Sequence, residues 1–410
     1  MEFNADLHIH GRFSAATSSD MDFRKLARGA KQKGVHLLAT GDCLHPTWLK
    51  EIREMEEVEE GTFELDGTRF ILTTEVEADK RVHHLLLFPS VSAVEAFSEA
   101  VERHTTTLRS DGRPKLRMTG EEIAQVARDV GAHLGPAHAF TPWTGIYAHF
   151  GSLKECYGDL ADDITYLELG LSANSDYGDG IEELRDVTFL SNSDAHSPQP
   201  VRLAREFNTI EAGDMTFDQV ILALTREKGC RVMMNVGLPP EEGKYNRTAC
   251  TRCFRQFDLE QVLARRWRCM CGGTIKKGVR DRALELARKQ GTQRPKHRPD
   301  YIYMIPLAEI IMRAIGHSSP FTGKVRARWE AIITEFGNEI DVLLHVPVND
   351  LRESAGEDVA RAIDAFRQGK VTVIPGGGGR YGTVLLPGQD PEEFAPPMDS
   401  SEKQRTLFDY

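Results

Sequence analysis

Five short clusters of histidine and carboxylate residues constrain how this chain can fold. They are Asp6-Leu-His8-Ile-His10, Thr40-Gly-Asp42, Glu75 with His83-His84, Gly135-Pro-Ala-His138 and Ser193-Asp194-Ala-His196. Each cluster lies at or near the end of a short apolar run that has the length of a β-strand. Because alternate residues of a strand share a face, His8 and His10 point the same way, as do Asp194 and His196. We therefore expect a fold that brings these strand ends together.

The first 235 residues alternate short apolar runs with amphipathic stretches. We predict strands at residues 2–9, 35–40, 70–74, 83–88, 132–135, 166–171 and 188–191, and helices at 23–33, 121–130 and 217–228. Strands separated by helices indicate parallel βα units, and this number of units favours an α/β barrel. The carboxyl ends of barrel strands meet at one mouth, where sites are built. Imidazole and carboxylate groups at such a mouth are natural ligands for zinc, iron or manganese.

Four of the seven cysteines lie within 22 residues of each other. Cys250-x-x-Cys253 and Cys269-x-Cys271 are separated by 15 residues and follow a linker-like stretch at residues 237–243. Seven cysteines in 410 residues are too few for a disulfide scaffold. Four thiolates at this spacing predict a closed, structural zinc site in a reducing cytoplasm. The isolated Cys43, Cys156 and Cys230 are expected to be small buried residues.

The net charge of −11 conceals a basic segment. Residues 245–300 hold 15 Lys/Arg and 5 Asp/Glu, a balance of +10, so the remaining 36 basic and 57 acidic residues sum to −21. A basic segment on an acidic chain predicts contact with a phosphate backbone. Its candidate DNA-binding residues are Arg252, Arg265, Arg266, Trp267 and Arg268. Trp267 suits base stacking, and the alternative is that it covers the small core of the zinc module.

Helices are predicted at residues 280–290, 307–315, 323–336 and 357–368, which makes a third, mainly helical segment. A short strand at 370–374 precedes Gly377-x-Gly379-x-x-Gly382, which matches the dinucleotide fingerprint as a string. That fingerprint needs a helix after it, and the strand-like residues 383–386 follow instead, so we reject nucleotide binding. From residue 390 the composition predicts disorder. The tail residues Gln404, Leu407, Phe408 and Tyr410 resemble the peptide that docks on the sliding clamp PCNA.

These observations divide the chain into four parts. We expect a metal-dependent barrel at residues 1–236, a four-cysteine zinc module at 245–279, a mainly helical DNA-binding domain at 280–389 and a disordered clamp-binding tail at 390–410. No stretch of about 18 uncharged apolar residues is present, so no membrane span is expected. The N-terminus has neither the basic start nor the apolar run of a secretory signal. We expect a cytoplasmic protein.

The histidine and carboxylate set resembles the PHP (polymerase and histidinol phosphatase) superfamily, which opens with Asp-x-His-x-His and closes with Asp-x-His. The resemblance implies a distorted seven-stranded βα barrel that holds two to three catalytic divalent metals (Zn, Mn, Fe or Mg). It assigns His8, His10, Glu75 and Asp194 to the first ion, Glu75, His84 and His138 to the second, and Asp42 and His196 to the third. Two departures stand out. Many members have histidine at the position of Asp42. The further ligand of the third ion that often follows His10 has no histidine here. His84 is chosen over His83 because Leu85-Leu86-Leu87 follows it directly.

The order of parts also resembles the archaeal endonuclease Q family. The matching stretches are residues 5–10, 15–19, 40–46 and 305–311, with the cysteine module and the glycine loop after Pro375. The resemblance implies a DNA repair enzyme whose metal-activated water, with Asp194, Glu75 and Asp42 as catalytic residues, hydrolyses the phosphodiester 5′ of hypoxanthine, uracil, xanthine and abasic sites. The products would carry 3′-hydroxyl and 5′-phosphate ends. The alternatives are a small-molecule PHP phosphatase of the histidinol-phosphate type and a non-catalytic DNA adaptor.

Overall fold

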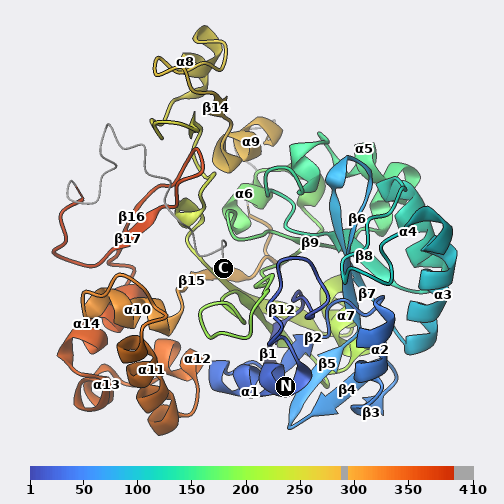
Figure 1. Ribbon diagram of the computed structural model, residues 1–410, viewed down its shortest axis with the longest axis horizontal. Coiled ribbons are helices and arrows are strands. Elements are labelled where there is room, and N and C mark those ends of the chain that lie inside the picture. The colour runs from blue at the N-terminus through green and yellow to red at the C-terminus, as the bar shows by residue number, and fades with distance from the viewer. Residues whose placement is uncertain (288–293, 392–410) are drawn as a thin grey trace.

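The computed structural model describes residues 1–287 and 294–391. The predicted tail peptide, with Gln404, Leu407, Phe408 and Tyr410, lies outside the described residues. Three parts can be distinguished along the chain, and they pack against one another (Figure 1). They are an α/β body formed by residues 1–237, a cysteine module at 245–279 that projects from it, and a C-terminal helical domain beside it.

The largest sheet of the α/β body has eight strands. Their order is β15-β12-β11-β1-β2-β5-β4-β3. The strands are β1 (Glu2–Asp6), β2 (Leu37–Ala39), β3 (Glu56–Glu59), β4 (Thr62–Leu65), β5 (Thr68–Ile71), β11 (Phe207–Glu211), β12 (Arg231–Gly237) and β15 (Asp300–Tyr303). β1 runs parallel to β2 and antiparallel to β11. β15 comes from beyond the cysteine module and pairs in parallel with β12, so the chain returns to the body before it enters the helical domain.

Two smaller sheets complete the body. β6 (Thr73–Glu77), β7 (His83–Leu87) and β8 (His133–Pro136) are antiparallel, and β9 (Tyr166–Glu168) pairs in parallel with β10 (Thr188–Leu190). The expectation of parallel βα units throughout is therefore wrong. The link between β6 and β7 is only a short turn, η1 (Asp79–Arg81), and parallel neighbours need a crossover of a dozen or more residues. The fold is mixed α/β, and a closed seven-stranded barrel stays a prediction.

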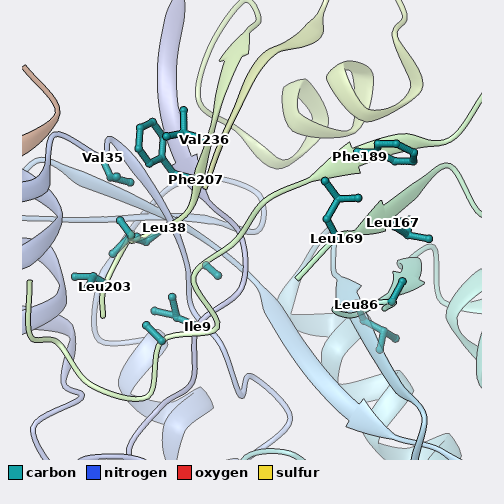
Figure 2. Packing of buried hydrophobic residues seen from close by; sticks show 14 of the residues in the cluster. Ile9, Val35, Leu38, Leu86, Leu167, Leu169, Phe189, Leu203, Phe207 and Val236 are labelled. Carbon is teal, nitrogen blue, oxygen red and sulfur yellow. The ribbon is translucent and has the colours of Figure 1, made fainter. Parts of the chain in front are cut away.

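The sheets pack on a shared apolar core. Figure 2 shows Leu38 from the large sheet, and Ile9 just after β1, in the same cluster as Leu86, Leu167 and Phe189 from the small sheets, and all of these side chains are buried. The Tyr166 hydroxyl donates to the carbonyl of Leu85 at 2.8 Å, which ties β9 to β7. The strand ends that carry the polar clusters are thus held together by packing of the apolar residues beside them.

The helices of the body lie around these sheets. They are α1 (Phe23–Lys33), α2 (Pro46–Ile52), α3 (Val91–Val101), α4 (Gly120–Asp129), α5 (Leu153–Tyr157), α6 (Ser175–Asp179) and α7 (Phe217–Thr225). The Asp22 side chain accepts a hydrogen bond from the backbone N–H of Lys25 and so caps α1, and Gly34 ends this helix at a φ of 87°. Both signals belong to the ends of helices. The predicted helix at residues 23–33 is confirmed residue for residue.

The remaining elements form the cysteine module and the helical domain. They are β13 (Ala249–Cys250), α8 (Leu259–Ala264), β14 (Ile275–Lys276), α9 (Val279–Leu286), α10 (Leu307–Ala314), α11 (Gly323–Phe336), α12 (Glu339–Leu344), α13 (Val348–Ala355), α14 (Glu357–Arg367), β16 (Thr372–Ile374) and β17 (Thr383–Leu385). Further 3₁₀ turns are η2 (Glu102–His104), η3 (Ile146–Ala148), η4 (Gly158–Asp163), η5 (Glu182–Leu184) and η6 (Pro240–Glu242). Among the described residues, every helix is too short or too polar to cross a membrane.

A buried ion pair joins the helical domain to the body. Lys33 at the end of α1 places its Nζ 2.5 Å from Oε1 of Glu339, and both side chains are almost fully buried. Glu339 also accepts hydrogen bonds from the Trp329 indole and from the backbone N–H of Leu307. A buried charge pair tolerates loss of one partner poorly, because the other charge remains buried without compensation.

We predict that Lys33→Met destabilises the protein by about 3–5 kcal/mol, because it leaves the Glu339 carboxylate buried without its cation. The measurement is the urea concentration at the midpoint of unfolding. Lys25→Met in the same helix is the matched control, since Lys25 pairs with Asp20 and Asp22 while exposed and its loss should change the midpoint little. Equal midpoints for the two variants would contradict the prediction.

Candidate metal centre and cysteine module

The first and last polar clusters are joined through the backbone. Ile9 and Ala195 form a parallel bridge. On either side of it, the N–H of His10 donates to the carbonyl of Ala195 at 3.0 Å and the N–H of Asp194 donates to the carbonyl of His8 at 3.0 Å. Asp194 has a φ of 48°, in the left-handed region that few non-glycine residues adopt. This pairing places the side chains of His8, His10 and Asp194 beside one another.

Three overlapping groups of metal-ligating atoms converge at this place. Within each group the ligand atoms lie within 4.8 Å of one another, and the groups are His8–His10–Glu75, His10–Asp194–His196 and Glu75–His83–His138. Nε2 of His10 lies 3.5 Å from Oε2 of Glu75 and 3.1 Å from Oδ1 of Asp194. Nε2 of His138 lies 2.7 Å from Oε1 of Glu75. Glu75 and His10 each belong to two groups; the two carboxylate oxygens of Glu75 could bind neighbouring ions, whereas the free Nε2 of His10 can bind one.

Three ligand atoms of these groups make no hydrogen bond of good geometry among the described residues. They are Nε2 of His8, Nε2 of His10 and Oδ1 of Asp194, all buried, and the last two lie 3.1 Å apart. Buried polar atoms are normally paired, and a site for cations explains why these are not. Burial alone would lower the pKa of His8, but the carboxylates of Glu168, Asp194 and Glu75 raise it to about 10. Carboxylate charge is thus concentrated around His8, and divalent cations fit such a place.

A second row of carboxylates orients the first two histidines. Nδ1 of His8 lies 2.6 Å from Oε2 of Glu168, and Nδ1 of His10 lies 3.0 Å from Oδ1 of Asp42. A carboxylate on one ring nitrogen fixes the ring and turns the other nitrogen toward a metal. The second oxygen of Asp42 accepts from the N–H of Gly11 at 2.6 Å. In this geometry Asp42 orients His10, and its predicted role as a direct ligand of a third ion is not supported.

The two consecutive histidines of β7 point to opposite faces, as successive strand residues must. Nδ1 of His83 lies 2.7 Å from Oε1 of Glu75 and 3.3 Å from Nε2 of His138. Nδ1 of His84 instead lies 2.8 Å from the hydroxyl of Tyr157, away from the three groups. The choice of His84 over His83 is therefore wrong. It followed the apolar run after His84, which does not determine the face of the strand.

Arg113 and Glu168 belong to this centre and were missed by the sequence reasoning. Nη1 of Arg113 lies 3.1 Å from Oε2 of Glu75. Burial alone would raise the pKa of Glu75, but His83 and Arg113 outweigh it and hold this pKa well below its usual value. Glu75 is thus an ionised carboxylate, the form that binds cations. A buried glutamate that ends the apolar strand Tyr166–Glu168 was the signal that could have found Glu168.

The four cysteines of the module come together as expected. Sγ of Cys250 lies 3.5 Å from Sγ of Cys271, and Sγ of Cys253 lies 3.6 Å from Sγ of Cys269. These separations are too long for disulfides and close to the ~3.8 Å edge of a tetrahedral zinc–thiolate site. The donor set therefore fits a structural zinc ion. The isolated cysteines Cys43, Cys156 and Cys230 are buried, as predicted.

The candidate DNA-binding residues lie on the outside of this module. Arg252, Arg265, Arg266 and Arg268 are exposed. Trp267 is half-buried and packs against the small core of the module, which is the alternative that the sequence left open. Lys277 places its Nζ 5.4 Å from the Trp267 ring centroid. The module thus presents cations around a partly covered aromatic ring.

The glycine loop after Pro375 approaches protein backbone rather than a nucleotide. Gly377 bridges to Arg247, and the N–H of Arg247 donates to the carbonyl of Gly376 at 3.0 Å. A Cβ at Gly378, whose φ is 68°, would lie 2.3 Å from the carbonyl oxygen of Cys250. Only glycine fits that approach, so the loop supports the cysteine module from behind.

The fold and this centre define a class: a mixed α/β protein with a histidine–carboxylate centre suited to two or more divalent cations, joined to a four-cysteine module. Comparison with known proteins gives the family. The chain is 45% identical to the lesion-specific endonuclease PfuEndoQ from Pyrococcus furiosus, with a TM-score of 0.90, over 96% of this chain and 98% of that one. It therefore belongs to the endonuclease Q family.

Further matches cover all or part of the chain. A structure of endonuclease Q in complex with a 27-mer duplex substrate, with an abasic lesion at the active site, is 46% identical, with a TM-score of 0.89, over 95% of this chain and 97% of that one. Residues 306–370 match the family model of the MJ0043 C-terminal domain. The uncharacterized protein MJ0043 of Methanocaldococcus jannaschii is 44% identical over 63% of this chain. The matched region spans only 32% of the length of that relative.

We predict that His83→Gln lowers the metal content of the protein by at least one ion per chain, because His83 faces Glu75 and His138. His84→Gln is the matched control on the opposite face of the same strand and should keep the full content. Elemental analysis after dialysis against metal-free buffer measures both, and the zinc of the cysteine module serves as the internal reference. Loss of metal in the His84 variant alone would reverse the assignment.

Proposed function

We propose that this protein is a DNA repair endonuclease that hydrolyses the phosphodiester on the 5′ side of a damaged nucleotide. The substrates are duplexes with hypoxanthine, uracil, xanthine or an abasic site, and the products carry 3′-hydroxyl and 5′-phosphate ends. The observation that carries the proposal is the near-complete match to a lesion-specific endonuclease, together with the converging ligand atoms of His8, His10, Glu75 and Asp194.

The residues of the centre have distinct tasks in this proposal. His8, His10, Glu75, His83, His138, Asp194 and His196 hold two to three ions of zinc, manganese, iron or magnesium. Such ions, when bound, acidify a water molecule and stabilise the charge on the phosphoryl oxygens. Glu168 and Asp42 keep the two opening histidines in orientation, and Arg113 adds a fixed positive charge beside Glu75. Asp194 is the most exposed carboxylate of the set, with 27% of its side chain accessible, so it is the one that an incoming substrate would reach.

The cysteine module supplies the contact with duplex DNA. Its exposed arginines Arg252, Arg265, Arg266 and Arg268 suit phosphate oxygens, and a structural zinc ion keeps their spacing. A small-molecule phosphatase of the histidinol-phosphate type has no use for such a module. A DNA adaptor without catalysis has no use for buried ligand atoms in three overlapping groups.

Nicking of a duplex with one deoxyinosine or one deoxyuridine, compared with an undamaged duplex, tests this function. We predict that Asp194→Asn lowers the nicking rate about a thousandfold or more, because it removes a carboxylate charge from the metal centre. Binding of the same duplex should change little, because the arginines of the module remain. Asp214→Asn, on an exposed loop before α7, is the control and should nick at the normal rate. Normal nicking by the Asp194 variant would show that this residue is assigned wrongly.

We also propose that the C-terminal tail binds the sliding clamp PCNA through Gln404, Leu407, Phe408 and Tyr410. The support is the sequence pattern alone. Deletion of residues 404–410 should leave nicking of a free duplex unchanged and abolish association with the clamp, measured by gel filtration of the mixed proteins. Clamp association that persists in the shortened protein would reject this role of the tail.

A further inference from the structure

Arg113 brings a permanent positive charge into a centre that otherwise consists of histidines and carboxylates. Its Nη1 donates to Oε2 of Glu75 at 3.1 Å, and 22% of the Arg113 side chain is exposed. A guanidinium stays charged at every pH at which a protein is folded. This charge therefore lies inside the metal centre and is still partly accessible from outside.

The backbone holds Arg113 beside the strand that carries Glu75. The N–H of Glu77 in β6 donates to the carbonyl of Pro114 at 3.0 Å, so the residue after Arg113 is attached to that strand. The N–H of Arg113 itself donates to Oδ1 of Asp111 at 3.1 Å. The guanidinium thus extends from a segment with a defined position next to the metal centre.

Gly112 allows the same segment to approach the second row of carboxylates. A Cβ at this position would lie 2.2 Å from Oδ2 of Asp42 and 2.6 Å from Oγ of Ser14. The hydroxyl of Ser14 donates to the same Oδ2 at 2.8 Å. Because no side chain fits there, the backbone next to Arg113 packs directly on the acid that orients His10. The segment is therefore a part of the centre.

Two roles fit such a guanidinium. In the first it serves only as a counter-charge for the carboxylate of Glu75. The hydrogen bonds of Arg113 favour a second role, because its Nε is buried and has no hydrogen-bond partner among the described residues. Buried donors are normally paired, and the planar fork of a guanidinium matches the oxygens of a phosphate. The bond to Glu75 does not use the full set of donors that Arg113 offers.

The accessible part of the centre carries both signs of charge. Asp194 and Arg113 are partly exposed, with 27% and 22% of their side chains accessible, whereas His10 and Glu75 are buried. A phosphate of a duplex is repelled by a carboxylate and attracted by a guanidinium. Of the two exposed groups, Arg113 is therefore the one suited to direct contact with phosphate oxygens.

The reaction of the proposed function requires such a contact. A water oxygen forms a bond to phosphorus, the bond from phosphorus to the 3′ oxygen of the preceding nucleotide breaks, and overall one proton of the water passes to that departing oxygen. The transition state carries negative charge on the oxygens around phosphorus, and an arginine beside them stabilises this charge. A guanidinium fixed beside the ligands of the metal centre can supply this stabilisation.

We propose that Arg113 is a catalytic residue that donates to an oxygen of the cleaved phosphate and stabilises the charge of the transition state. This inference rests on the proposed function and adds to it a residue that contacts the substrate without binding metal. The bond to Glu75 orients the guanidinium for this contact. Loss of Arg113 should then slow nicking while the metal content of the protein stays normal.

The test uses the full chain, Arg113→Ala and Arg113→Lys, each loaded with metal and checked for metal content and thermal midpoint. We expect Arg113→Ala to keep its metal and to nick a deoxyinosine duplex about a hundredfold or more slowly in single turnover, as loss of one transition-state donor does. Methylguanidinium restores the missing group and should raise the rate of this variant, whereas methylammonium at the same concentration should not. Arg113→Lys keeps a charge beside Glu75 without the planar fork, and it should also nick slowly with full metal content.

Arg117→Ala is the matched control, since Arg117 is an exposed arginine of the same segment. It should nick at the normal rate with and without methylguanidinium. A lower metal content in both Arg113 variants would show that the guanidinium serves Glu75 alone, and it would overturn the catalytic role. A normal rate for Arg113→Lys, or no response of Arg113→Ala to methylguanidinium, would overturn it as well. Failure of the unsubstituted protein to nick the duplex is a different result, which rejects the proposed function before any variant is compared.

Discussion

The carboxylate of Asp6 connects the two ends of the chain segment that forms the metal centre. It accepts hydrogen bonds from the N–H of Ser193 at 3.1 Å, the hydroxyl of Ser193 at 2.5 Å and the N–H of Ala204 at 3.2 Å. Burial raises its pKa to about 6 even though these bonds lower it. Burial of this carboxylate costs desolvation free energy. Its hydrogen bonds hold residues 8–10 in register with residues 194–196. Without that register His8 and Asp194 would not meet.

Electrostatics then decides what each member of the centre does. A histidine that binds a cation needs a neutral ring with its free nitrogen facing inward, and a carboxylate behind the ring provides this orientation. Glu168 stands behind His8, and Asp42 stands behind His10. The acid at position 42 thus has a physical explanation: it serves as the partner of His10.

The sequence predicted those features that repeat within a few residues. The ends of α1 follow from Asp22 and Gly34, and the shared faces of His8 with His10 and Asp194 with His196 follow from the strand period. Contacts between single residues that are far apart in the sequence leave no periodic pattern in it. Arg113 and Glu168 were missed for this reason, and β11 and β12 were not foreseen, so the antiparallel pairs of the large sheet were not foreseen either. The error at His83 and His84 has the same origin, because only the neighbours of β7 in space determine which face is inside.

The cysteine module is held on one side by the body and on the other by the C-terminal glycine loop. The guanidinium of Arg282 in α9 donates to the carbonyls of Tyr147 at 2.9 Å and Phe150 at 3.0 Å, in the segment that follows Trp143. On the other side Gly378 packs against the carbonyl of Cys250, where no side chain would fit. The hydrogen bonds of Arg282 to backbone carbonyls, and the approach of Gly378 to Cys250, which leaves no room for a Cβ, both restrict where the module can lie. These contacts connect the cysteine module both to the segment that follows His138 and to the C-terminal glycine loop. In the proposed function, a duplex that reaches the metal centre would also meet the exposed arginines of this module.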